Sequence, residues 1–366
     1  MFSAHFYGTT TPTPMAATTA AKARTIGSKF GSTRLTRLLT QSANPVSPFP
    51  SITQIRTIET LAFEEIRSPP TNGSASKPYN YSSVLFLHGL LGTGRNWRSF
   101  AKSLSDYLSR NNKSISSREW RMVLVDLRNH GRSAGIKEIG PPHDIYNAAK
   151  DLADLVRWNG WEWPDVVIGH SMGGKVGLQF VKSCVGGEYG EKVRLPKQLW
   201  VLDSIAGPVH PDNRDGEVEK VLQTLWSLPS HIPSRKWLVD HMMQLGFSKS
   251  LSEWIGSNLK KSGDHQSFSF NLEAAIQMFN SYKETDYWSL LEHPPKGTEI
   301  SMVRAENSDR WHPETVRKLE QLASREHDAY EGKMSLHVLP NAGHWVHVDN
   351  PKGLLDILAP RIASLH

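Results

Sequence analysis

A short apolar run that ends in a serine between glycines most constrains the fold of this 366-residue chain. Residues 167–174 read Val-Ile-Gly-His-Ser-Met-Gly-Gly and contain the pattern G-x-S-x-G, with Ser171 at its centre. In this pattern a strand turns sharply into a helix and lifts the serine hydroxyl into a cleft. The serine backbone is strained, and side chains two residues away would collide, so Gly169 and Gly173 suit the turn. An ordinary glycine–serine turn is the alternative, so the interpretation needs partners elsewhere in the chain.

Buried apolar runs alternate with stretches of helical spacing along most of the chain. The runs predict strands at 61–66, 83–87, 122–125, 166–168, 199–202, 299–303 and 335–339. The helical spacing covers 97–108, 145–158, 175–182, 314–325 and 352–365. Continuous apolar runs are typical of strands that are covered on both faces, and this alternation predicts an α/β fold with a doubly wound parallel sheet. Ligands bind such sheets at the carboxyl ends of the strands, where His88, Asp126, Ser171 and Asp203 fall.

The alternation is interrupted between residues 208 and 295. This stretch has helical spacing and many large apolar side chains, among them Trp226, Trp254 and Phe279. We interpret it as a helical cap inserted into a core that comprises residues 59–207 and 296–366. Most of these side chains are expected to form the core of the cap itself, and a few to make the cleft apolar.

The first 58 residues have the composition of an organelle transit peptide. They are rich in Ser and Thr, contain six basic residues and have no acidic residue. A short basic amphipathic stretch at 34–39 favours a mitochondrial address, whereas the Thr- and Ala-rich start suits a plastid equally well. Without the six basic residues of this leader, the formal net charge of +6 disappears, with 36 basic and 36 acidic residues left. The charge therefore does not indicate nucleic-acid binding.

Several other classes of protein are disfavoured by composition. No window of about 18 apolar residues predicts a membrane span. A single cysteine, Cys184, excludes an intrachain disulfide. The Gly-rich residues 89–94 are spaced G-x-x-G-x-G, unlike the G-x-G-x-x-G of dinucleotide sites, so no cofactor is expected. His344 and His347 lack further ligands nearby in the sequence, and no metal site is predicted.

The chain supplies the partners that a nucleophilic serine needs. Serine is a weak nucleophile unless a histidine takes its proton, and an acid must orient that histidine. Ser171, Asp203 and His344 occur in the order Ser, Asp, His, with His344 in a loop after the last predicted strand. These three residues are our candidate catalytic residues.

Four motifs in this order resemble the α/β-hydrolase superfamily. They are His88-Gly89, the stretch 126–131 (Asp-Leu-Arg-Asn-His-Gly), the stretch 169–174 and Ala342-Gly343-His344-Trp345. The stretches 88–92 and 341–347 most resemble the branch that contains alpha/beta hydrolase domain-containing protein 11 and related bacterial esterases. The resemblance covers residues 61–365.

The resemblance implies a role for each site residue. Ser171 would attack an acyl carbonyl, His344 would act as base and then as acid, and the backbone N–H groups of Leu90 and Met172 would form the oxyanion hole. His88, Arg128 and His130 are expected to be loop anchors. Many members carry the acid after the strand that is predicted here to end at Val303.

The acid therefore has two candidates. The position that aligns with the acid of those members is Ser308, and Asp309 follows it one residue late. Asp203 ends the preceding strand and can also reach the histidine. We take Asp203 as the acid and keep Asp309 as the alternative.

These assignments predict a serine hydrolase that cleaves carboxylic esters or thioesters of apolar acyl groups through an acyl-enzyme. Its partner is a small-molecule substrate. A carbon–carbon bond hydrolase or an acyltransferase could keep the same residues. A ligand sensor or partner-binding protein that retains the triad is the alternative from another class.

Overall fold

The computed structural model describes residues 60–67, 81–111, 119–209, 216–325 and 331–365. The predicted transit peptide, residues 1–58, lies outside the described residues.

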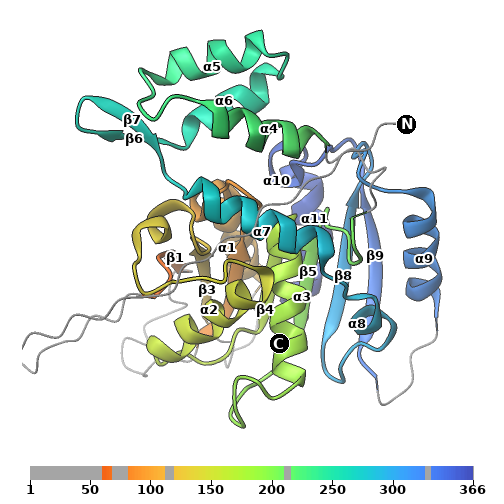
Figure 1. The fold of residues 1–366 in the computed structure, drawn as a ribbon. Coiled ribbons are helices and arrows are strands. Elements are labelled where there is room, and N and C mark those ends of the chain that lie inside the picture. Colours follow the sequence, from red (N-terminus) through yellow and green to blue (C-terminus); the bar gives the residue numbers. More distant parts are fainter. Residues whose placement is uncertain (1–59, 68–80, 112–118, 210–215, 326–330, 366) are drawn as a thin grey trace, which may run out of the picture. The chain divides into compact units, whose positions relative to one another are not determined.

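Seven of the described strands form one sheet in the order β1-β3-β2-β4-β5-β8-β9. They are β1 (Phe63–Arg67), β2 (Tyr81–Leu87), β3 (Glu119–Val125), β4 (Val166–His170), β5 (Gln198–Leu202), β8 (Glu299–Ala305) and β9 (Lys333–Leu339). The pair β1–β3 is antiparallel and all other neighbours are parallel. The predicted α/β fold with a mostly parallel, doubly wound sheet is confirmed, and Figure 1 shows its layers.

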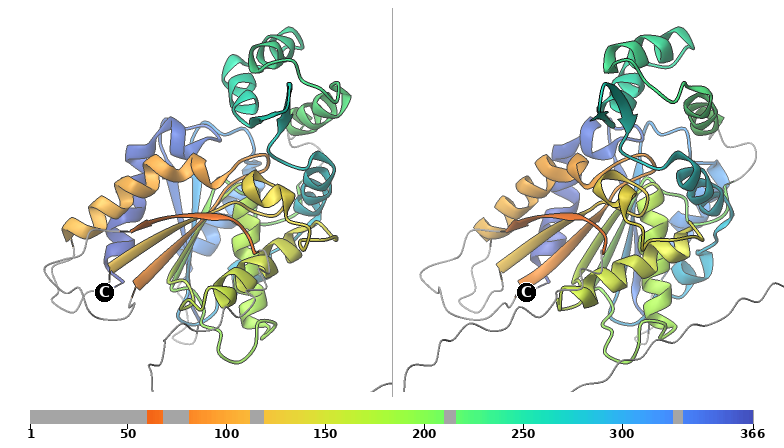
Figure 2. Two further views of the ribbon diagram at one scale, coloured as in Figure 1. Left: turned by 90° about the vertical axis from the view of Figure 1, so that its left-hand side faces the viewer. Right: turned by 60° about the vertical axis from the view of Figure 1, so that its left-hand side comes forward.

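The two faces of the sheet pack against different helices because successive strand residues point to opposite sides. Val84 and Phe86 of β2 pack with α1 (Arg98–Asn111) and α11 (Pro351–Ala363). Leu85 and Leu87 pack with α2 (Ile145–Trp158) and α3 (Met172–Val185). Figure 2 shows α1 and α11 on one side of the sheet and α2 and α3 on the other. Further helical elements near this sheet are η1 (Gly94–Trp97), η2 (Gly131–Gly135), α9 (Pro313–Ser324) and α10 (Val346–Asp349).

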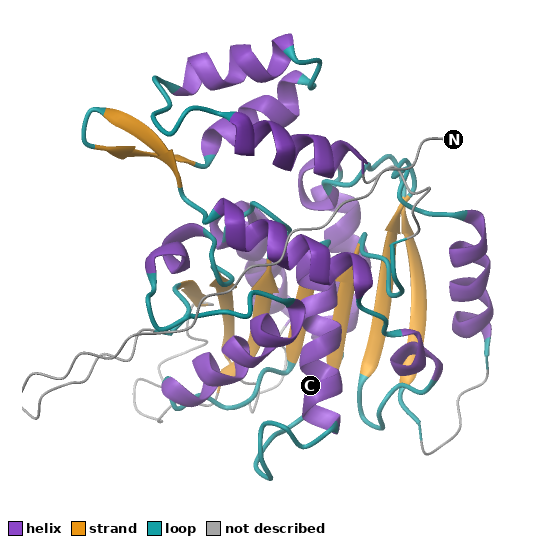
Figure 3. Cartoon of the chain, in the orientation of Figure 1, coloured by secondary structure: helices purple, strands orange, loops and turns teal. Residues whose placement is uncertain are grey.

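The chain leaves the sheet after β5 and returns at β8. The segment between them contains α4 (Gly216–Ser227), α5 (Arg235–Gln244), α6 (Lys249–Ser257), α7 (Leu272–Glu284) and α8 (Trp288–Glu292). It also contains a hairpin of β6 (Leu259–Ser262) and β7 (His265–Phe268), which the sequence analysis did not anticipate. In Figure 3 this hairpin and the helices α4 to α6 lie beyond the carboxyl ends of the strands.

The hairpin was not predicted because its strands carry few apolar side chains. Lys260 and Lys261 are exposed, and Gly263 adopts a positive φ of 60° in the turn. Its backbone pairs in register without an apolar face that would mark it in the sequence. Among the described helices, none is both long and apolar enough to cross a bilayer.

Candidate active site

Ser171 stands at the junction of β4 and α3 in a strained backbone conformation. Its φ is 52° and its ψ is −121°, values that a residue with a side chain rarely adopts. A Cβ atom on Gly169 would lie 2.2 Å from the backbone oxygen of Gly173, and one on Gly173 would lie 2.5 Å from that of Leu87. Both glycines are therefore required by backbone contacts, as the sharp turn from strand to helix demands.

His344 lies in the loop between β9 and α10, beside the carboxylate of Asp203 at the end of β5. Its Nδ1 is 2.7 Å from Oδ2 of Asp203. Because a carboxylate can only accept, Nδ1 carries the proton and Nε2 is the unprotonated ring nitrogen. This tautomer is the one that a general base needs.

Asp203 accepts three further hydrogen bonds. Its Oδ1 accepts from the backbone N–H of Ala305 at 3.0 Å and from Nε1 of Trp311 at 2.6 Å, and its Oδ2 accepts from Oγ of Ser308 at 2.7 Å. Burial alone would raise the pKa of this carboxyl group, but His344, Trp311 and Ser308 outweigh burial and leave the pKa below its usual value. The group is thus an ionised carboxylate at neutral pH.

The alternative acid is situated differently. Asp309 is exposed on the wall of a cavity that Ser171 also lines, whereas its neighbour Ser308 donates to Asp203. The loop after β8 therefore supplies hydrogen-bond donors to the carboxylate of Asp203.

His170, which precedes the serine, was not singled out in the sequence. Its Nε2 lies 2.7 Å from the backbone oxygen of His344, and it donates to that carbonyl group. Burial, and then the neighbouring His344 and His347, hold the pKa of His170 well below its usual value, so the ring stays neutral. Only the position of His170 directly before Ser171 could have pointed to it.

His347 packs on Trp97, with ring centroids 4.3 Å apart. Burial, followed by the proximity of His344, lowers the pKa of His347 to about 4. In the described part of the chain, no group of three or more His, Cys, Asp or Glu side chains could hold a metal ion.

The two predicted oxyanion-hole residues come from different elements. Met172 is the first residue of α3, so its N–H has no partner within the helix, and the positive end of the helix dipole lies there. Leu90 lies in the loop after β2, where the next N–H, of Leu91, donates to Nε2 of His130 at 3.0 Å. Leu90, Met172, Ser171 and His344 line the same cavity.

The chain is similar to known proteins in both sequence and fold. The model of the alpha/beta hydrolase family matches residues 84–357, which is most of the chain. The chain belongs to the alpha/beta hydrolase family. The sn-1-specific diacylglycerol lipase ABHD11 of Mus musculus is 24% identical over 296 residues, which cover 80% of this chain and 83% of the lipase. A putative esterase/lipase of Haemophilus influenzae is 25% identical, with 74% of this chain and 80% of that protein covered.

A solved structure shares the fold of this alpha/beta hydrolase. It is an esterase from a marine microorganism, with a TM-score of 0.60 and 21% identity, and the match covers 84% of this chain and 99% of that one. The predicted resemblance to the superfamily, and to its branch with bacterial esterases, is confirmed. The chain is thus an alpha/beta hydrolase with lipase and esterase relatives.

The cavity beside Ser171 opens to solvent, and its empty space, including solvent at the mouth, is about 1070 Å³. The segment between β5 and β8 contributes apolar and aromatic residues of α4, α6 and α7 to its wall, and others come from the loops and helices at the sheet. Trp254 of α6 meets Trp345 of the loop after β9 edge to face, with centroids 4.3 Å apart. Three charged residues also line the cavity, namely Glu217, Asp309 and Arg310. The cavity therefore offers a large apolar wall and a charged region to a substrate.

Lys175 of α3 is a second residue that the sequence analysis missed. It is fully buried, and its ammonium group donates to the backbone oxygens of Gly207 at 2.8 Å, Tyr282 at 2.5 Å and Thr285 at 2.9 Å. Gly207 lies where the chain leaves the sheet, and Tyr282 and Thr285 lie at the end of α7. A lysine on a helix is usually exposed, so its sequence position gave no signal of this contact.

Proposed function

We propose that this protein is a serine hydrolase that cleaves carboxylic esters or thioesters of apolar acyl groups. The observation that carries the proposal is the shared cavity of Ser171 and His344, with Nδ1 of His344 held 2.7 Å from Oδ2 of Asp203. A strained serine, an oriented base and a buried carboxylate are the parts that nucleophilic acyl transfer requires. The order Ser, Asp, His along the chain also suits the family.

The proposed reaction has two halves. Oγ of Ser171 attacks the acyl carbonyl while Nε2 of His344 takes the hydroxyl proton, and the backbone N–H groups of Leu90 and Met172 bind the oxyanion. The tetrahedral intermediate collapses, and His344 returns the proton to the departing alcohol or thiol. A water molecule, deprotonated by His344, then attacks the acyl-enzyme. His344 returns this proton to Oγ of Ser171 as the Oγ–acyl bond breaks and the carboxylic acid leaves. Asp203 stabilises the imidazolium ion in both halves.

The proposed substrate class rests on the cavity and on the relatives. We propose that residues 208–295 act as a cap, because α4, α6 and α7 contribute apolar residues to the wall of the cavity beside Ser171. The relatives named as a diacylglycerol lipase and a putative esterase/lipase support an ester of an apolar acid. No cofactor enters the proposed reaction.

A fluorophosphonate probe and an ester panel test this proposal. We expect the probe to label the wild-type protein and not Ser171→Ala, and turnover of p-nitrophenyl esters and acyl thioesters of graded length to depend on Ser171. Absence of labelling in folded protein would refute the proposal. Labelling with a single turnover, together with ligand-dependent capture of a partner protein, would instead favour the alternative function of a ligand sensor that retains the triad.

We further propose a mitochondrial destination, with a plastid as the alternative, from the composition of residues 1–58. Import of the full-length protein into isolated mitochondria and chloroplasts tests it. Protection from added protease should depend on these residues, and equal protection of a form without them would count against the proposal.

A further inference from the structure

The loop after β3 and the loop after β2 are joined by two histidines that bond in a reciprocal way. Nε2 of His88 accepts the backbone N–H of Leu127 at 2.9 Å, and Nε2 of His130 accepts that of Leu91 at 3.0 Å. The two rings lie 5.2 Å apart and are buried. Each loop is thus held by an imidazole from the other.

The bond to Leu91 fixes a strained part of the proposed oxyanion hole. Leu91 has a φ of 58°, which is unfavourable for a residue with a branched side chain. Such conformations persist only where surrounding contacts hold them. The N–H group of Leu91 belongs to the peptide group between Leu90 and Leu91, which is next to the peptide group that carries the N–H of Leu90. The orientation of the first peptide group therefore limits the orientation of the second.

We propose that His130 is a positioning residue that holds Leu90 and Leu91 in the conformation that binds the oxyanion. This inference rests on the proposed function and deepens it. His130 does not contact the reacting atoms; it acts through the peptide group between Leu90 and Leu91.

The surroundings of His130 determine which of its ring nitrogens accepts a hydrogen bond. Its Nδ1 donates to the backbone oxygen of Arg128 at 2.8 Å, so Nε2 is unprotonated and its lone pair accepts from Leu91. Burial, and then the proximity of His88, lower the pKa of His130 to about 3. The imidazole is therefore a neutral acceptor at any pH at which a hydrolase of this kind would work.

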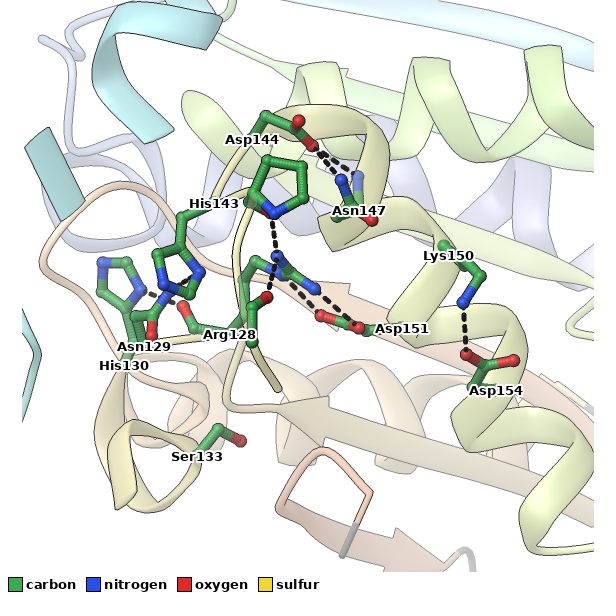
Figure 4. Close-up of polar contacts among 12 residues, drawn as sticks. Arg128, Asn129, His130, Ser133, His143, Asp144, Asn147, Lys150, Asp151 and Asp154 are labelled. Atoms are coloured by element: carbon green, nitrogen blue, oxygen red, sulfur yellow. Dashed lines mark hydrogen bonds and ion pairs between the residues drawn. The ribbon is translucent and has the colours of Figure 1, made fainter. Parts of the chain in front are cut away.

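The loop that carries His130 is itself firmly held, as Figure 4 shows. Arg128 donates from Nε and Nη2 to the two carboxylate oxygens of Asp151 on α2, at 2.7 and 3.0 Å, and from Nη1 to the backbone oxygen of Pro142 at 2.6 Å. Only 4% of the Arg128 side chain is exposed. A paired charge and a backbone contact thus define the position of the histidine.

The same loop also contacts the proposed cap. His130 forms an isolated antiparallel bridge with Phe270, and the backbone N–H of Asn271 donates to the backbone oxygen of Asn129 at 2.9 Å. Asn271 is the N-cap of α7, whose residues line the cavity. The loop therefore touches the oxyanion arm on one side and a wall of the cavity on the other.

The test compares His130→Met, which removes the acceptor, with His130→Gln, whose amide oxygen can take the place of Nε2. Loss of a whole oxyanion donor costs about 10²–10³ in kcat, so a loosened donor should cost about 10- to 100-fold. We expect His130→Met to lower kcat by this factor with KM changed less than about threefold, and His130→Gln to recover most of the loss. The affinity for a boronic acid, which forms a tetrahedral adduct, should fall in step with kcat.

A control variant and a second measurement make the result decisive. His337 is half-buried, packs on Trp200 away from the cavity and has a pKa lowered by burial to about 4, so His337→Met should leave kcat unchanged. Should His130→Met fail to fold, the amide hydrogen exchange of Leu91 in the wild-type protein decides, and exchange as fast as in exposed loops would overturn the inference.

The possible failures can be told apart. Wild-type kcat in folded His130→Met would overturn the positioning role of His130 while the proposed function stands. Full activity in Ser171→Ala would overturn the proposed function itself.

Discussion

Replacing Asp203 by Asn is the sharpest test of the proposed triad. A large loss of kcat is expected if Asp203 is the catalytic acid, and a small one if Asp309 is. The carboxylate accepts from Ala305 and Trp311 at Oδ1 and from Ser308 and His344 at Oδ2. An amide has one accepting side and one donating side, so it cannot satisfy all four donors at once.

The orientation of the new amide determines the size of the effect. If the amide oxygen keeps the bonds to Ala305 and Trp311, the NH₂ group faces Ser308, whose hydroxyl can rotate, and His344, which must shift its proton to Nε2. The opposite orientation points the NH₂ group at two N–H donors, and leaving such groups unpaired costs about 1–3 kcal/mol each. The first orientation is therefore favoured, and it leaves His344 unable to take the proton of Ser171. In serine proteases the loss of this charge lowers kcat about 10⁴-fold, and we expect a loss of about 10³- to 10⁴-fold here.

The assay is steady-state hydrolysis of a p-nitrophenyl ester, with thermal unfolding to verify that each variant is folded. Asp309→Asn is the matched control, since Asp309 is exposed at the wall of the cavity, and its kcat should stay within about threefold of wild type. If Asp309→Asn alone lost orders of magnitude, or Asp203→Asn stayed within tenfold of wild type, our assignment of the acid would be wrong.

Three further predictions concern stability. Gly169→Ala should destabilise the fold by about 4 kcal/mol or more, because its Cβ would lie 2.2 Å from a backbone oxygen, whereas Gly135→Ala, with nothing within 4 Å, should be neutral in the same urea titration. Lys175→Met should cost about 3 kcal/mol or more by urea unfolding, since three carbonyl groups, two of them buried, lose a donor. Lys182→Met on the exposed side of α3 should not, and equal values would refute this. The free energy of unfolding should fall as the pH is lowered from about 6.5 towards 4, by up to about 1.4 kcal/mol per pH unit for each histidine that stays neutral when folded but is protonated when unfolded. Burial lowers the pKa of six histidines among the described residues, namely His88, His130, His143, His170, His337 and His347, and a pH-independent stability over this range would contradict the prediction.

The sequence was informative about the sheet because parallel strands are buried on both faces. Apolar runs such as Val166–Ile168 stand out for this reason, and β4 extends the prediction only to His170. The helix predicted at 145–158 has the same bounds in the structure. Since the carboxyl ends of parallel strands share one edge, residues directly after a strand, such as Asp203, could be named as neighbours in space.

The remainder depends on contacts between distant segments that carry no local pattern. The Nε1 atom of Trp311 and the hydroxyl of Ser308 reach Asp203 across more than a hundred residues of sequence. The sequence cannot show that His170 donates to the backbone of His344, because the G-x-S-x-G pattern accepts any residue directly before Ser171. The hairpin of β6 and β7 lacks an alternating apolar face and was missed for that reason.

The buried ammonium group of Lys175 sets a rule for any attempt to exchange the proposed cap for that of another protein. A grafted segment would have to present carbonyl oxygens near the positions of those of Gly207, Tyr282 and Thr285, one at its entry and two at its exit. A chimera that joins the chains elsewhere would enclose a charge without acceptors, which is among the costliest defects a folded protein can carry. Transplants should therefore include residues 207–285 as one unit, or replace Lys175 by an apolar residue at the same time.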